Sequence, residues 1–136
     1  MARDRQALAD SFAAAWNAGD VEATLAYLDP GIEVDWSESN APYRGVYRGV
    51  NGYRRLFAEL RQSFQATRTE VHDRVVSGPH LAVANTAHMQ GREGIEVAAR
   101  STIVFTFGDD DRIVAIRLFQ AHDDALRAIG AEGSIG

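Results

Sequence analysis

The sequence has no cysteine, which excludes disulfide bonds, thiolate nucleophiles and thiolate metal sites. It also has no apolar run long enough to span a membrane, and its first residues are charged in a helical pattern, without the apolar core of a signal peptide. These absences predict a cytoplasmic protein with no membrane partner.

Clusters of basic residues are scarce as well. The 14 Lys and Arg residues are outnumbered by 19 Asp and Glu residues, which gives a formal net charge of −5. Because phosphate groups are bound by clustered Lys and Arg, the composition argues against nucleic acid as the main partner. We also predict no metal site, because the histidines lie on separate strands or turns without the spacing of metal ligands. They are His72, His80, His88 and His122.

The length of 136 residues suits one domain with a sizeable core and is too short for two. We predict a single domain over residues 1–130 and a C-terminal tail at residues 131–136. The sequence contains no internal repeat and no low-complexity segment.

Hydrophobic periodicity predicts the order of the elements. Leu8, Phe12 and Trp16 recur at steps of four, which is typical of the apolar stripe of a helix over residues 3–18. Asp20 predicts the N-cap of a second, shorter helix that includes Leu28 and is closed by the turn residues at 29–31. The other predicted elements are a strand at 32–36, a loop at 37–46, a helix at 49–65, strands at 69–77, 81–90, 97–107 and 112–120, and a helix at 123–129.

The last two strands show the clearest pattern. Residues 97–107 and 112–120 both alternate between two faces, and the Gly-Asp cluster at 108–111 supplies turn residues. We therefore predict a long antiparallel hairpin in a curved sheet whose apolar face is covered by helices, which is an α+β fold.

Several short runs carry a resemblance to a known family. They are Trp16-Asn17-Ala18-Gly19-Asp20, Val34-Asp35-Trp36, Tyr47-Arg48-Gly49, the hairpin at 105–117 and Asp124-Ala125-Leu126-Arg127-Ala128. With these runs the chain resembles the nuclear transport factor 2-like superfamily, and within it the SnoaL-like and ketosteroid-isomerase-like domains. The resemblance implies a cone-shaped, curved, mainly antiparallel β-sheet with helices packed on its concave face, no cofactor, and a homodimer. It specifies the fold better than the activity, since this cone carries both enzymes and binding modules.

The catalytic residues of the resembling enzymes are not retained. Ketosteroid isomerases use two tyrosines, an aspartate base and a protonated aspartate to stabilise an enolate. Carried over by register, these roles fall on side chains that cannot supply them: Phe12, Phe57, Trp36 and Ile103. Limonene epoxide hydrolases pair an arginine with an aspartate two residues away on one strand. Here the residue two positions after Arg100 is Thr102. The acid/base Asp and His of SnoaL-type cyclases have candidates that we do not transfer: His88, His122, Asp123 and Asp124.

Parity along the helices and strands predicts an apolar pocket that contains two amides. Asn85 and Gln120 occupy positions where the pattern asks for apolar residues, and an amide buried without partners costs about 1–3 kcal/mol. They either bind a ligand or a water, or bond each other and the backbone. The predicted ligand-binding residues are Phe12, Trp16, Trp36, Tyr53, Phe57, Asn85, Ile103, Phe105, Leu118 and Gln120, with Val34, Val83, Ala87 and Ile116 on the same face.

Two acids are candidates for catalysis. Glu38 continues the parity of Val34 and Trp36 into the loop, so its carboxylate would lie at the pocket mouth as a general base. Asp35 has the opposite parity, and a bulge at the strand end would be needed to turn it inward.

The opposite face of the sheet mixes polar and apolar residues and predicts a homodimer interface. Its members are Thr86, His88, Arg100, Thr102, Thr106, Arg117 and Phe119. A register shift of one residue would exchange the two faces, bring Asp35, His88 and Arg100 inward, and favour a hydrolase.

Two functions remain open on the sequence. One is a cofactor-independent isomerase, cyclase, dehydratase or hydrolase that acts on a polyketide-, terpenoid- or steroid-like substrate in the apolar pocket. The other is a non-catalytic module that binds a small hydrophobic ligand, which the loss of every transferable acid favours. A carboxylate or histidine in the cavity would favour the first function, and its absence the second.

Overall fold

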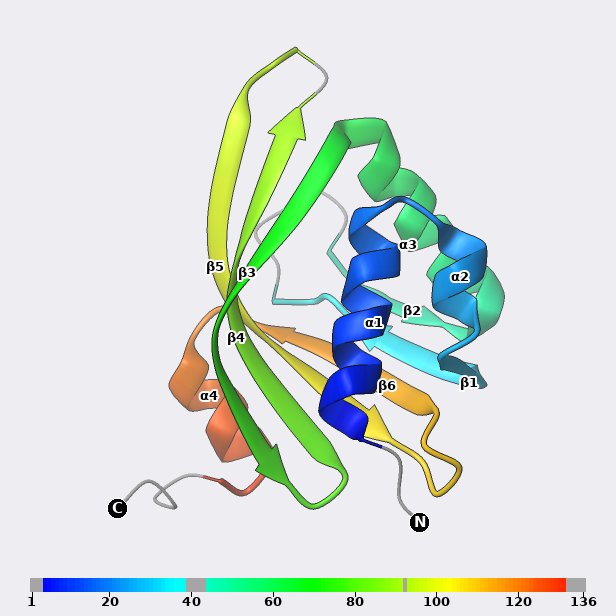
Figure 1. Cartoon of the computed structure of the whole chain (residues 1–136), viewed down its shortest axis with the longest axis vertical. Coiled ribbons are helices and arrows are strands. Elements are labelled where there is room, and N and C mark those ends of the chain that lie inside the picture. The colour runs from blue at the N-terminus through cyan, green and yellow to red at the C-terminus, as the bar shows by residue number, and fades with distance from the viewer. Residues whose placement is uncertain (1–3, 39–43, 92, 132–136) are drawn as a thin grey trace.

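The computed structural model describes residues 4–38, 44–91 and 93–131. Its elements follow in the order α1 (Arg5–Asn17), α2 (Val21–Leu25), β1 (Leu28–Asp35), β2 (Val46–Arg48), α3 (Gly49–Ser63), β3 (Phe64–Ser77), β4 (His80–Gly91), β5 (Glu96–Phe107), β6 (Ile113–Phe119) and α4 (His122–Ala128). In this described part, no helix is both long and apolar enough to cross a membrane. Figure 1 shows α1, α2 and α3 on one side of a strongly curved sheet and α4 on the other.

The strands form one sheet in the order β2-β1-β6-β5-β4-β3. Strands β3 to β6 pair antiparallel in succession, which confirms the predicted hairpin and the α+β fold. The sheet also contains one parallel pair, β1 with β6, in which Val34 lies opposite Ile116. The short strand β2, which falls in and just after the predicted loop at 37–46, was not predicted and pairs antiparallel with β1.

The second helix is shorter than the sequence pattern predicts. Asp20 caps it as expected, since its carboxylate accepts a hydrogen bond of 3.1 Å from the amide of Ala23. The helix ends at Leu25, however, and the strand β1 already begins at Leu28. The predicted helix-closing residues at 29–31 therefore lie inside a strand, where a register shift between Leu28 and Glu33 interrupts the pairing with β6 and tolerates a proline.

The main core fills the space between α1, α3 and the concave face. Tyr53 and Leu56 of α3 are fully buried there, with Ile32 of β1 and Ile113 of β6. The phenol of Tyr53 donates a hydrogen bond of 2.7 Å to the hydroxyl of Thr24, which in turn donates to the carbonyl of Val21. This chain of bonds joins α3 to α2.

A second core lies on the convex face, beneath α4. Leu126 and Ile129 pack there against Val104 and Phe119. Helix α4 therefore covers part of the face that was predicted to form a dimer interface. Two members of that predicted surface, Thr102 and Phe119, are buried within a single chain, whereas Arg100 and Arg117 are exposed. The homodimer stays a prediction. Ala131, which we expected to begin a free tail, is also buried there, and its amide donates to the carbonyl of Leu126. Residues 132–136 lie outside the described residues.

We predict that Tyr53→Phe destabilises the protein at pH 7 but not at pH 11. The variant loses the hydrogen bond to Thr24, which costs about 1 kcal/mol. Burial raises the pKa of the Tyr53 phenol above its ordinary value, although the bond to Thr24 opposes the shift. In the unfolded chain the phenol ionises near pH 10, so above that pH Tyr53 lowers the stability of the wild type by about 1.4 kcal/mol per pH unit, and the variant lacks this contribution. Burial also raises the pKa of Tyr47, but that residue is present in both proteins.

Urea unfolding at both pH values measures this difference. The chain suits the experiment, because all 14 of its Lys and Arg residues are arginine, so no lysine titrates between the two pH values. A stability difference between wild type and variant that is the same at pH 7 and pH 11 would contradict the assignment.

Candidate functional site

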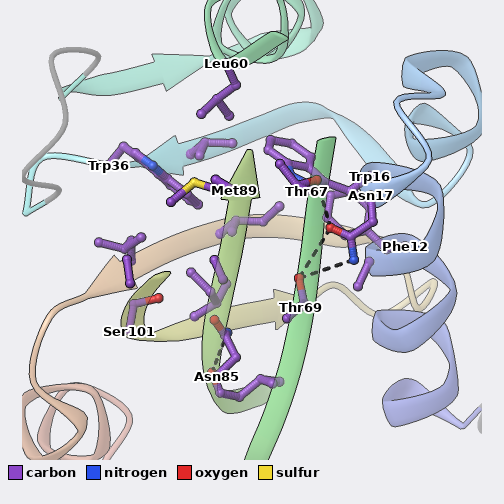
Figure 2. A pocket seen from close by; sticks show the side chains of 18 of the residues that line it. Phe12, Trp16, Asn17, Trp36, Leu60, Thr67, Thr69, Asn85, Met89 and Ser101 are labelled. Atoms are coloured by element: carbon purple, nitrogen blue, oxygen red, sulfur yellow. Dashed lines mark hydrogen bonds between the residues drawn. The ribbon is translucent and has the colours of Figure 1, made fainter. Parts of the chain in front are cut away.

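A cavity of about 600 Å³ lies between the helices α1 and α3 and the concave face of the sheet. All ten predicted ligand-binding residues border it, together with Val34, Val83, Ala87 and Ile116. The structure thus brings together residues from α1, α3 and five strands. Figure 2 shows this arrangement, with Phe12, Trp16 and Asn17 of α1 on one side and Asn85, Met89 and Ser101 of the sheet facing the space.

The helix side of the cavity is an aromatic wall. Phe12 and Trp16 are one turn apart on α1, and Tyr53 and Phe57 are one turn apart on α3, so each pair faces the sheet from one side of its helix. The ring centroids of Trp16 and Phe57 are 5.0 Å apart in an edge-on contact. Phe12 makes a similar contact with Phe105 of β5 at 5.8 Å. This wall is rigid, because each ring is held by a neighbouring ring.

A polar network that the sequence analysis missed also borders the cavity. The side-chain amide of Asn17, at the end of α1, donates to the hydroxyl of Thr69 at 3.2 Å, and its carbonyl oxygen accepts from Thr67 at 3.1 Å. The dashed lines in Figure 2 mark these bonds. β3 begins at Phe64, earlier than the predicted 69, so Thr67 was left outside the strand. The available sequence signal for this network was the spacing of Thr67 and Thr69, because residues two apart share one face of a strand.

The two predicted amides have different surroundings. Asn85 is buried in the cavity wall at 6% exposure, and its Nδ2 donates to the carbonyl of Val83 at 3.2 Å. Gln120 borders the cavity but is exposed, and its Nε2 donates to the carbonyl of Glu38 at 3.0 Å. Asn85 is therefore part of the interior, whereas Gln120 fastens the loop after β1 to the end of β6.

The two predicted catalytic acids do not border the cavity. Asp35 is half-buried, and its carboxylate accepts hydrogen bonds from the amide and hydroxyl of Ser37. Glu38 is exposed, and the contact it makes with Gln120 is through its backbone. Strand parity extended into the loop was misleading here, because a turn at residues 37–38 ends the alternation.

The charged groups around the cavity are peripheral. Asp10 is exposed and forms an ion pair of 2.8 Å with Arg74. Arg100, which parity placed on the outer face, is exposed and reaches the cavity edge, as does the half-buried Arg61. Among the described residues that line the cavity, none is a histidine, and Asp10 is the one carboxylate. The charged residues of the described part that border the cavity are thus one aspartate and two arginines, of which Asp10 and Arg100 are exposed.

Comparison with known families identifies the chain. The model of the SnoaL-like domain matches residues 9–116, which is most of the sequence. No curated protein matches the sequence at a significant level.

Solved structures share the fold at low sequence identity. A nuclear transport factor 2-like protein of unknown function from Burkholderia pseudomallei has a TM-score of 0.77 and 17% identity, over 94% of this chain and 98% of its own. The Mycobacterium tuberculosis protein RV0760c, in complex with estradiol-17beta-hemisuccinate, has a TM-score of 0.74 and 14% identity, over 88% and 95%. SalBIII, an epoxide hydrolase/cyclase-like enzyme of pyran ring formation in the polyether salinomycin, has a TM-score of 0.72 and 20% identity, over 88% and 92%.

We predict that Asn17 and Thr69 are energetically coupled. A double-mutant cycle with Asn17→Ala and Thr69→Val should give a coupling of about 1 kcal/mol in urea unfolding, because either change alone breaks the bonds between them. Asn17→Ala with Thr86→Val, on the outer face of β4, is the control pair, and its effects should add. Additive effects in the first cycle would contradict the network.

Proposed function

We propose that this chain, which belongs to the SnoaL-like domain family, binds one small hydrophobic molecule in its cavity and performs no acid–base chemistry on that molecule. The observation that carries this proposal is a cavity of about 600 Å³ lined mostly by apolar side chains, in which Asp10 is the one carboxylate among the described residues and no histidine is present. A volume in this range accommodates a drug-sized ligand, and apolar walls with a few polar groups are typical of such sites.

Affinity in this cavity would come from the removal of apolar ligand surface from water. The contribution is roughly 25 cal/mol per Å² of apolar area, against which stands the entropy lost on association. The aromatic wall is already ordered by its own ring contacts, so binding requires little further ordering of Phe12, Trp16 and Phe57. A ring compound that fills much of the space should bind with roughly micromolar affinity.

The neighbouring structures support a ligand of this kind. RV0760c holds a steroid derivative within the same fold. SalBIII is instead an enzyme of ring formation, so the fold by itself does not decide between binding and catalysis. The residues that line the cavity favour binding. General acid–base catalysis requires a titratable group within hydrogen-bonding reach of the reacting atoms. Among the described lining residues there is no histidine, Asp10 is exposed and paired with Arg74, and the phenol of Tyr53 donates its hydrogen bond to Thr24.

We predict that Ala99→Phe weakens ligand binding at least tenfold, whereas Ala98→Phe does not. These neighbours lie on opposite faces of β5, and Ala99 borders the cavity while Ala98 does not. A phenyl ring at position 99 occupies space that the ligand needs, and the same ring at position 98 points away from it. Titration with Nile red, an uncharged dye whose fluorescence rises in apolar surroundings, measures both affinities.

Equal affinities for the two variants would place the dye elsewhere and refute the proposal. The chain provides a second signal, since both of its tryptophans, Trp16 and Trp36, border the cavity and their emission should change when it fills. Mass spectrometry of bound compounds after prolonged incubation tests the absence of catalysis. Conversion of a bound polyketide-like compound or epoxide by the wild type, but not by Ala99→Phe, would favour the enzyme instead.

A further inference from the structure

Asn85 is the polar residue that the cavity buries most deeply. Three polar residues of the described part are buried: Thr24, Asn85 and Thr102. Of these, Asn85 is the one that borders the cavity. Its neighbours on the closed side, Val83 and Phe105, are equally buried and apolar. Burying a polar group in such surroundings costs free energy unless the group forms a hydrogen bond. An atom of Asn85 without a protein partner therefore indicates a position where a ligand could bind.

The orientation of the Asn85 amide follows from its one hydrogen bond. Its Nδ2 donates to the carbonyl of Val83, and because a carbonyl can only accept, the amide cannot be turned around. No described residue donates a hydrogen bond to its Oδ1. Every fully buried polar side-chain atom of the described residues has a partner, so this oxygen is open to the adjoining space. The space at this position is the cavity.

Ser101 provides the matching group on the next strand. It is the direct antiparallel partner of Asn85 and also borders the cavity. Side chains at such paired positions have Cβ atoms about 4.5–5.5 Å apart. The serine hydroxyl donates or accepts a hydrogen bond, whereas Oδ1 of Asn85 only accepts. Together they offer an acceptor and a donor side by side, as Figure 2 shows for the two side chains.

Part of the sheet floor of the cavity is made of small side chains. The next pair on this face of the two strands is Ala87 with Ala99, and both residues border the cavity. The small side chains leave room in the cavity that Phe12 and Trp16 border from the helix side. A flat ring system fits between a rigid aromatic wall and a floor of this kind.

We propose that the ligand is an uncharged, flat ring compound whose hydroxyl group is held by Asn85 and Ser101. This inference rests on the proposed function and specifies the chemistry of its ligand. A hydroxyl group donates to Oδ1 of Asn85 and accepts from Ser101, so it satisfies both groups. A carbonyl or an ether oxygen would oppose Oδ1 with a second acceptor, and a carboxylate would bring a negative charge against Oδ1 and incur the cost of leaving water.

The test compares two ligands that differ only in this group, 2-naphthol and 2-methoxynaphthalene, by isothermal titration calorimetry at pH 7. The wild type should bind 2-naphthol about five- to tenfold more tightly, the range expected for one buried hydrogen bond. Asn85→Leu, which is similar in size and apolar, should bind both compounds with equal affinity. Thr86→Val, on the next residue and the opposite face of β4, is the control and should keep the wild-type preference.

The outcomes separate this inference from the proposed function. If the wild type binds both compounds equally, the inference is refuted and hydrophobic binding stands. If neither compound binds, both are refuted. A preference for 2-naphthol that survives in Asn85→Leu would assign the hydroxyl to another part of the cavity and refute the role of Asn85. The wild-type comparison remains decisive even if the variant does not fold.

Discussion

The contact between four aromatic side chains and the concave face of the sheet determines the rest of the architecture. Phe12 and Trp16 of α1 interlock with Tyr53 and Phe57 of α3, and the two helices are therefore held to the sheet as one layer. The rings set the distance between this layer and the strands. The strands border the cavity with both large and small side chains, and the small ones at Ala87 and Ala99 add to its room.

The distribution of charge around that space is the second constraint. Ion pairs such as Asp10 with Arg74 and Arg5 with Asp111 lie at the edges of the fold, where water reduces the cost of holding a charge. The interior carries neutral polar groups that are mostly satisfied by one another, as in the bonds between Asn17 and the two threonines. A site of this composition binds and orients a neutral molecule more readily than it moves protons.

The two helix-covered faces of the sheet have different roles. The concave face leaves a cavity because the covering layer is aromatic and bridges a curved surface. The convex face is partly covered by α4, whose Leu126 and Ile129 pack on Val104 and Phe119 without leaving a cavity of similar size among the described residues.

Local periodicity determined much of this protein by itself. The spacing of Phe12 and Trp16, the alternation of Ile103 and Phe105, and the cap at Asp20 are short-range patterns, and the corresponding helices and strands lie where they predict. The same parity identified the residues around the cavity, because successive side chains on a strand must point to opposite faces.

What local periodicity could not supply depends on pairing between distant segments. The parallel contact of β1 with β6, the strand at Leu28, the cover of Phe119 by α4 and the bonds from Asn17 to Thr67 each join residues far apart in the chain. Glu38 was misplaced because the turn after β1 ends the alternation that would aim its side chain inward, whereas Asp35 lies away from the cavity, as its own parity indicates. Periodicity reports which face a residue occupies within its own element, whereas only the tertiary structure decides what lies opposite that face.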